Sequence, residues 1–133
     1  MIYLLDTCIL SLFARGNPAV LGHIKASNPD DIAVSSVTLM EIEYGLALNP
    51  GRAQKLRPIL DAFFSSVHLL TYAREDAKAT AAVRATLRAT GTPIGPYDIM
   101  LAGCGLARGL TFVTANTREF SRVSGLALED WSS

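Results

Sequence analysis

The sequence predicts an α/β fold in which helices cover both faces of a mainly parallel sheet. Two patterns in the 133-residue chain predict it. Short β-prone runs alternate with longer segments of helical periodicity, which is the order that crossovers between parallel strands produce. The first two runs are also continuously apolar, as strands buried on both faces are. Because 50% of the residues are hydrophobic, we expect one core and a single domain over residues 1–133.

The first half of the chain supplies two strands and four helices. Asp6 and Thr7 open the first helix directly after a strand, and Pro18 opens the second where proline is tolerated. Residues 49–51 break the helical pattern and divide an αα-hairpin. The expected elements are a strand over 2–5, helices over 6–13 and 18–27, a turn over 28–31, a strand over 32–35, and helices over 36–48 and 52–65.

The second half places a rigid loop between two helices. An alanine-rich helix over 73–90 ends at Gly91, which suits the left-handed conformation that follows many helices. The loop 91–98 holds two glycines and two prolines and ends in Asp98, before an almost purely apolar helix that runs to Arg108. The other expected elements are strands over 67–70 and 110–114, a helical turn over 117–120, a last strand over 126–128, and a tail anchored by Trp131.

Composition excludes several classes of protein. No apolar run approaches the roughly 18 residues of a membrane span, and the N-terminus lacks the basic region of a signal peptide. We therefore expect a soluble, cytoplasmic protein with no membrane partner. Twelve Lys and Arg balance twelve Asp and Glu, so the chain has no overall basic footprint for nucleic acid. A cluster of acids in one site would leave an excess of bases elsewhere, so net charge does not exclude a polyanionic substrate. Cys8 and Cys104 lie in apolar contexts and are expected to be reduced core thiols.

Three acids share one structural position. Asp6 ends the first strand, and Glu41 lies in the first turns of the helix after the second. Asp98 opens the helix before the fourth strand. Open parallel sheets bind ligands beyond the carboxyl ends of their strands. We therefore expect these acids to converge at that edge, where Thr114 and Asn116 also arrive from the fourth strand.

The chemistry of converging carboxylates is specific. They repel one another, and their pKa values rise unless a cation lies between them. A cluster of oxygen ligands suits Mg²⁺ or Mn²⁺ rather than zinc. His23 and His68 fall in a predicted helix and strand away from the acids, so histidine-driven catalysis is disfavoured. The pattern favours metal-assisted hydrolysis of a phosphodiester, with one or two ions.

Each acid also has a purely structural interpretation. Asp6 fits a helix N-cap, and Thr38 with Glu41 fits the capping-box pattern. Asp98, close after Pro96, fits the first turn of a helix. Taken together at one sheet edge, the three acids favour a site.

Two other functions stay open. The chain would also suit a catalytically weak module that only binds RNA or a protein partner. An aspartyl-phosphate protein, either a receiver or a phosphatase, is disfavoured. Thr7 and Cys8 follow Asp6 where one phosphatase type has a second aspartate, and no lysine follows the fourth strand as a receiver requires.

The acids belong to five segments that span nearly the whole chain: LLDT at 4–7, SSVTLMEIEYG at 35–45, GTPIGPYD at 91–98, VTANTREF at 113–120 and GLALEDW at 125–131. In this order the segments resemble the PIN-domain family and, within it, the VapC toxins of type II toxin–antitoxin modules. Each segment alone is a weak signal, and together they are specific.

The resemblance implies a three-layer α/β/α sandwich with a mainly parallel central sheet. It implies a Mg²⁺- or Mn²⁺-dependent endoribonuclease that cleaves cellular RNA, with tRNA, ribosomal RNA and messenger RNA all open as targets, and so inhibits translation and growth. It also implies a homodimer and a cognate VapB-type antitoxin. By motif position, Asp6, Glu41 and Asp98 would be the catalytic, metal-binding acids, and Thr114 would support the site.

The chain departs from the family pattern at two positions. Cys8 stands where the family often has asparagine. Asn116 stands where many members have a fourth acid, which weakens the case for a second ion. We expect Asn116 to act at most as a carbonyl ligand, and Glu119, one helical turn on, to supply the missing charge directly or through water.

Candidates for contacts with RNA lie beside these acids. Arg118 and Arg122 are four residues apart near the expected site, with a solvated helix face as the alternative interpretation. Tyr97 precedes Asp98 and suits stacking on a base, with packing of the loop as the alternative. Glu43 is expected on another face of the helix that carries Glu41.

Overall fold

Five short parallel strands form the middle of the structure, in the spatial order β3-β2-β1-β4-β5. The computed structural model describes residues 1–133. Tyr3 of the central strand lies opposite Ile32 on one side and Thr111 on the other. The strands are β1 (Tyr3–Leu5), β2 (Ile32–Ser35), β3 (His68–Leu70), β4 (Thr111–Val113) and β5 (Leu128–Glu129).

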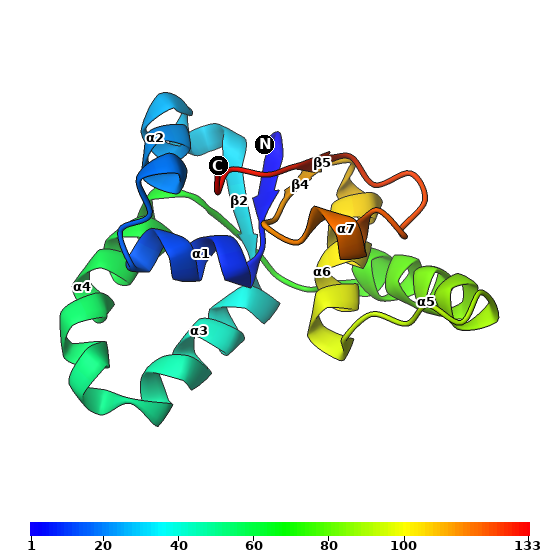
Figure 1. The fold of residues 1–133 in the computed structure, drawn as a ribbon, viewed down its shortest axis with the longest axis horizontal. Coiled ribbons are helices and arrows are strands. Elements are labelled where there is room, and N and C mark those ends of the chain that lie inside the picture. Colours follow the sequence, from blue (N-terminus) through cyan, green and yellow to red (C-terminus); the bar gives the residue numbers. More distant parts are fainter.

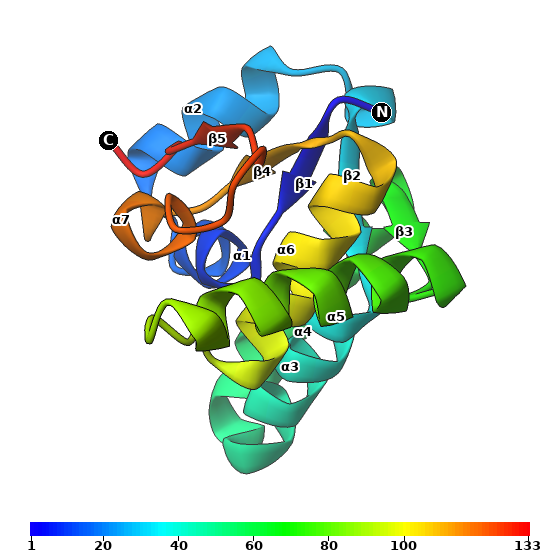
Figure 2. The same cartoon turned by 90° about the vertical axis from the view of Figure 1, so that its right-hand side faces the viewer.

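Helices cover both faces of this sheet, which confirms the predicted three-layer α/β/α sandwich. The two ribbon views show one group of helices on each face (Figures 1 and 2). The first group is α1 (Thr7–Ala14), α2 (Pro18–Ala26), α3 (Ser36–Leu48) and α4 (Pro50–Ser66). The opposite layer is α5 (Arg74–Ala89) and α6 (Pro96–Arg108), and the short α7 (Thr117–Phe120) follows β4.

Alternate residues of the strands fill the two halves of the core. Leu4 packs with residues of α5 and α6, whereas Leu5 packs with residues of α1, α3 and α4. This follows from the two-residue period of a strand, which sends successive side chains to opposite faces. Both side chains are fully buried, so the continuous apolar run at the start of the chain is explained by a central strand covered on both faces.

The elements agree with the sequence prediction except at a few boundaries. The helix expected from residue 52 begins at Pro50, because the side chain of Asn49 accepts a hydrogen bond from the Arg52 amide and caps it. The expected turn over 28–31 contains the 3-10 helix Pro29–Asp31. The last strand lies at Leu128–Glu129 rather than over 126–128, where it pairs with β4.

Trp131 is buried, whereas Cys8 is exposed. Trp131 is 2% exposed and packs edge-on against Tyr3 and flat on His23, so the tail is anchored as predicted. Cys8 is exposed, so the prediction of a core thiol is wrong there, whereas Cys104 is buried. Cys8 lies in the first turn of α1, and the apolar residues around it in the sequence face the core on the other side of that helix. No helix combines the length and apolarity needed to cross a membrane.

Helices α5 and α6 approach one another unusually closely at Gly103. A Cβ atom added there would lie 2.0 Å from the Thr80 hydroxyl oxygen and 2.8 Å from the Thr80 amide nitrogen, so only glycine fits. The hydroxyl of Thr80 is already engaged, because it donates to the Asp76 carbonyl and accepts from the Tyr72 hydroxyl.

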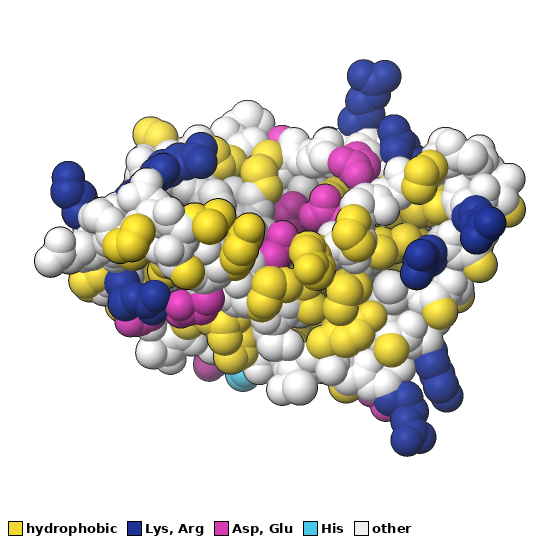
Figure 3. All heavy atoms as spheres, turned by 90° about the horizontal axis from the view of Figure 1, so that it is seen from below, with side chains coloured by type: hydrophobic (Ala, Val, Ile, Leu, Met, Phe, Trp, Pro, Cys, Tyr) yellow, Lys and Arg dark blue, Asp and Glu magenta, His cyan; other side chains and the backbone are white.

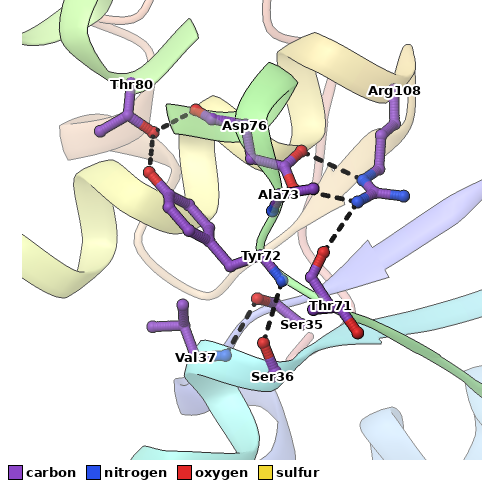
Figure 4. A network of polar contacts seen from close by, with 9 residues as sticks. All are labelled: Ser35, Ser36, Val37, Thr71, Tyr72, Ala73, Asp76, Thr80 and Arg108. Carbon is purple, nitrogen blue, oxygen red and sulfur yellow. Dashed lines mark hydrogen bonds and ion pairs between the residues drawn. The ribbon is translucent and has the colours of Figure 1, made fainter. Parts of the chain in front are cut away.

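A buried ion pair joins the two helices beside this contact (Figure 4). The Asp76 side chain is 0% exposed and accepts hydrogen bonds from Arg108 Nε at 3.1 Å and Nη2 at 2.9 Å, and from the Ala73 amide at 2.7 Å. Arg108 also donates to the Thr71 carbonyl at 3.0 Å. Burial alone would raise the pKa of Asp76, but the hydrogen bonds from Arg108 and Ala73 outweigh it and hold that pKa below its usual range. The pair fixes the C-terminal end of α6, the helix whose first turn carries Asp98.

Candidate metal centre

Asp6 lies directly after the central strand and serves two purposes. Its amide donates to the Val113 carbonyl at 3.0 Å, which continues the pairing of β1 with β4. Its Oδ1 accepts from the Ile9 amide at 2.9 Å and caps α1, so the structural interpretation of this residue is confirmed. The carboxylate is only 3% exposed, and the cap uses one oxygen. Capping through Oδ1 does not engage the second oxygen, so capping and metal binding are compatible.

The environment of Asp6 opposes its ionised form. Burial is the main cause that raises its pKa to about 6, and the charges of Asp98 and Glu41 raise it further. The side chain of Thr114 and the Ile9 amide act in the opposite direction by hydrogen bonding. A buried carboxylate that is repelled by two neighbouring acids is stabilised by a cation.

Glu41 is held by a residue of a different helix. Its Oε1 accepts a hydrogen bond of 2.7 Å from the Thr7 hydroxyl, which also lies 3.3 Å from the hydroxyl of Thr38. The predicted capping box is therefore wrong. The N-cap of α3 is Ser35, whose hydroxyl accepts from the Val37 amide at 3.1 Å, and Thr38 is buried inside the helix.

Replacing Thr7 with valine is expected to weaken Mn²⁺ binding by about tenfold, while Thr7→Ser keeps it. The hydroxyl that orients Glu41 is lost in the first variant and kept in the second, and residues that orient metal ligands typically contribute about 10–100-fold. Isothermal titration with Mn²⁺ measures the effect. Equal affinities for Thr7→Val and wild type would show that Thr7 does not position Glu41 for the ion.

Asp98 reaches the same region from the first turn of α6. It is half-buried, and the helix begins without a side-chain cap, so its carboxylate is not used to satisfy backbone donors. Burial raises its pKa, and the charges of Glu119 and Glu41 raise it further. The left-handed backbone of Gly91, with φ of 71°, turns the chain after α5 into the loop that delivers Asp98.

Asn116 and Glu119 act as a pair across the site from Asp98. The side-chain amide nitrogen of Asn116 donates a short hydrogen bond to Oε2 of Glu119. The backbone amide of Asn116 donates to the Thr114 hydroxyl at 2.9 Å, and Thr114 is fully buried. Because the charge of Glu119 raises the pKa of Asp98, Glu119 brings a carboxylate to the side of the site where Asn116 has none.

Four acids are thus electrostatically linked: Asp6, Glu41, Asp98 and Glu119. Figure 3 shows acidic side chains gathered in a hollow near the middle of one face, flanked by hydrophobic side chains. No three acidic, histidine or cysteine side chains lie close enough to ligate one ion directly as they stand. Mg²⁺ commonly keeps several waters and uses one or two carboxylates, so the all-oxygen donor set fits such an ion better than zinc.

The other predicted residues lie around this hollow or away from it. Tyr97 is 48% exposed, and Arg118 and Arg122 are exposed without a carboxylate partner. Their exposure leaves them available to RNA without showing contact. Glu43 pairs with Arg57 through two hydrogen bonds of 3.0 and 2.9 Å on another face of α3, as expected. Thr7 was not identified from the sequence, although its hydroxyl directly follows Asp6.

The contribution of Asp6 to the stability of the metal-free protein is expected to fall between about pH 4 and pH 6. The pKa of Asp6 rises from 3.8 to about 6 on folding, so in this window the folded state binds more protons than the unfolded state. The contribution of Asp6 to stability is therefore fully present below about pH 4 and is lost as pH rises through 6, by up to about 3 kcal/mol at about 1.4 kcal/mol per tenfold change. Urea denaturation in EDTA measures this. Asp6→Asn removes this titratable group. The difference in the free energy of unfolding between wild type and Asp6→Asn must therefore change with pH if folding raises the pKa of Asp6.

Comparisons with known proteins agree on one family. A family model described as "PIN domain" matches residues 3–126. The chain is 40% identical over 130 residues to the "tRNA(fMet)-specific endonuclease VapC" of Shigella flexneri, covering 98% of each chain. It superposes with a TM-score of 0.91 on a structure described as DNA-bound VapBC from Salmonella typhimurium, at 36% identity and 98% coverage of each chain. A VapBC2 structure from Rickettsia felis, bound to a promoter DNA fragment, gives a TM-score of 0.90 at 28% identity, covering 98% of this chain and 99% of that one.

Proposed function

Because the chain belongs to the PIN-domain family and, within it, to the VapC ribonucleases of toxin–antitoxin systems, we propose that it is the toxin of such a system and cleaves cellular RNA with Mg²⁺ or Mn²⁺. The observation that carries the metal dependence is the gathering of acids around Asp6 and Asp98: beyond the effect of burial, the charges of Asp98 and Glu41 raise the pKa of Asp6, and those of Glu119 and Glu41 raise the pKa of Asp98. Carboxylates that raise one another's pKa are stabilised by a cation, and RNA hydrolysis is a reaction that such a cation assists.

The side chains divide the work of the reaction among them. Asp6 and Asp98 would hold the ion, and Thr7 keeps Glu41 turned toward it through a bond of 2.7 Å. Asn116 orients Glu119 by a hydrogen bond. The Glu119 carboxylate would then take the place of the fourth acid. When bound, Mg²⁺ or Mn²⁺ polarises the phosphate, lowers the pKa of a water and offsets the charge of an in-line displacement. The Thr114 hydroxyl favours the ionised form of Asp6, which is the form that binds a cation.

The substrate class and partners follow from the relatives. The Shigella flexneri and Salmonella typhimurium relatives are each named "tRNA(fMet)-specific endonuclease VapC", so we propose tRNA as the substrate class. The VapBC structures pair such an enzyme with an antitoxin, so we propose a VapB-type antitoxin as the inhibitor of this one. A homodimer is part of the same proposal. So is a cytoplasmic location, because tRNA and its toxin must meet in one compartment.

Sequencing of RNA 5′ ends after brief induction tests this function. Wild type is expected to create new 5′ ends at one position in a tRNA and to stop growth, whereas Asp98→Asn creates none. Glu43→Gln is the matched control, since it changes a carboxylate of α3 that pairs with Arg57 outside the site. New 5′ ends of equal abundance in the Asp98→Asn strain would show that Asp98 is not part of the catalytic site.

A catalytically weak binding module is the remaining candidate, and Asn116 in place of an acid is the observation that favours it. Purified wild type that binds RNA without cleaving it in Mn²⁺ would support that candidate.

A further inference from the structure

A cavity opens between α1, α3 and α4 and runs up to the acid cluster. Its volume is about 170 Å³, and Thr7 and Glu41 form part of its wall. One buried water needs only roughly 10–15 Å³ of such space, whereas pockets for drug-sized ligands measure roughly 300–1,000 Å³. The cavity therefore has room for one ring-sized group next to the site.

Gly45 leaves one wall of this cavity without a side chain. It lies in the interior of α3 and lines the cavity. A glycine there weakens the helix relative to alanine or leucine. Neither of the usual reasons for glycine applies, because its backbone is not left-handed and an added Cβ would meet no atom within 4 Å. The missing side chain leaves this part of the cavity wall open.

The chemistry of the walls indicates an anionic ligand with an apolar ring. Arg15, which follows α1, and Arg52, in the first turn of α4, both line the cavity and are exposed. Neither has a carboxylate partner, since the salt bridges of the protein use Arg57 and Arg108. Ile42 and Leu46 add a buried apolar surface on the α3 side. Guanidinium groups pair with phosphate oxygens, and apolar walls take the face of a base.

We propose that this cavity takes the base of the nucleotide next to the cleaved phosphodiester, while Arg15 and Arg52 hold its backbone phosphates. The proposal rests on the proposed ribonuclease function and adds a binding subsite to it. Because Glu41 belongs both to the acid cluster and to the cavity wall, a strand that occupies the cavity leads directly to the reacting phosphate. The arginines contribute affinity, and the shape of the cavity contributes preference at that nucleotide.

The test compares three variants with wild type, using purified tRNA for cleavage and a short single-stranded RNA of mixed sequence for binding. Arg15→Gln/Arg52→Gln removes both positive charges, and Gly45→Leu fills the cavity without changing charge. Arg84→Gln/Arg88→Gln is the matched control, because it removes two exposed arginines of α5, outside the cavity. KM and kcat are measured in Mn²⁺, and binding is measured by fluorescence anisotropy in the inactive Asp98→Asn background at several salt concentrations. Melting temperature verifies folding.

The proposal predicts separate effects on binding and on chemistry. The Arg15/Arg52 variant should raise KM about tenfold or more with kcat nearly unchanged. Its plot of log affinity against log salt should be shallower by about 1.4, at about 0.7 for each lost phosphate contact to a single strand. Gly45→Leu should raise KM while melting at the same or a higher temperature, and neither variant should alter Mn²⁺ binding. The Arg84/Arg88 control should match wild type.

Several results would overturn it. If both cavity variants keep the wild-type KM and salt slope while Asp98→Asn is inactive, the subsite is wrong and the ribonuclease function stands. If they keep RNA affinity but lose inhibition by the antitoxin, the cavity belongs to a protein partner instead. If wild type does not cleave RNA at all, the proposed function fails, and the anisotropy data alone then decide whether Arg15, Arg52 and Gly45 bind RNA.

Discussion

Replacing Asp98 with asparagine is expected to lower the rate of RNA cleavage by about a thousandfold or more while leaving the protein folded. A metal ion contributes several kcal/mol to transition-state stabilisation, and about 4 kcal/mol corresponds to about a thousandfold in rate. Asparagine has nearly the same shape as aspartate but offers only a neutral carbonyl to the ion. The measurement is the cleavage rate of purified tRNA by each protein in Mn²⁺.

The same variant should be at least as stable as wild type without metal. Burial and the neighbouring charges of Glu119 and Glu41 already oppose the ionised form of Asp98, so a neutral amide removes an unfavourable interaction. Adding Mn²⁺ should raise the melting temperature of wild type more than that of Asp98→Asn. Glu43→Gln serves as control, since its carboxylate lies with Arg57 on another face of α3. A variant that cleaves at the wild-type rate would show that Asp98 holds no essential ion.

Replacing Arg108 with alanine is expected to destabilise the protein by about 3–5 kcal/mol. The change removes both guanidinium hydrogen bonds to Asp76 and leaves a 0% exposed carboxylate with only the Ala73 amide as partner. Because the pair joins α5 to α6, and α6 carries Asp98 in its first turn, RNA cleavage should also decline. Urea denaturation at neutral pH measures the free energy of unfolding.

A double variant separates the charge from the packing in that pair. Asp76→Asn/Arg108→Ala has no buried charge, so it should lose less stability than Arg108→Ala alone. Arg84→Ala gives the reference for an exposed arginine on α5. If Arg108→Ala unfolds at the same urea concentration as Arg84→Ala, the pair between the two helices has no structural importance.

The sequence was sufficient to predict the fold and the placing of three acids at one sheet edge, because both depend on local signals. Leu4 and Leu5 lie in an apolar run that marks a central strand, and Asp6 directly follows it. The positions of Glu41 and Asp98 follow from the rule that parallel strands end at one edge. Their convergence is supported by the way they raise the pKa of Asp6.

What the sequence did not predict depends on contacts between distant segments. Thr7 and Glu41 are 34 positions apart, and only the placement of α1 against α3 brings them together. The same is true of Asp76 and Arg108, which are 32 positions apart. The local pattern instead suggested a capping box at Thr38 and Glu41, because that motif is recognised by spacing alone. The helix is in fact capped by Ser35.

The surroundings of Gly45 also could not be predicted from the sequence. Within the sequence Gly45 closes the 35–45 segment that carries the family resemblance, but that position assigns it no role. Its meaning comes from the cavity that it lines together with Arg15 and Arg52, which belong to three separate parts of the chain. Only the packed structure shows that no neighbouring atom requires a glycine there.

RNA cleavage by metal-free protein, with Mn²⁺ then added back, is the most direct test of whether these acids form a metal-dependent ribonuclease. Protein treated with EDTA should leave purified tRNA intact, and Mn²⁺ should restore cleavage at concentrations that match the affinity from isothermal titration. Asp6→Asn and Asp98→Asn should show neither cleavage nor the heat of binding. Cleavage at an undiminished rate in excess EDTA, or an unchanged heat of binding in both variants, would contradict the assignment.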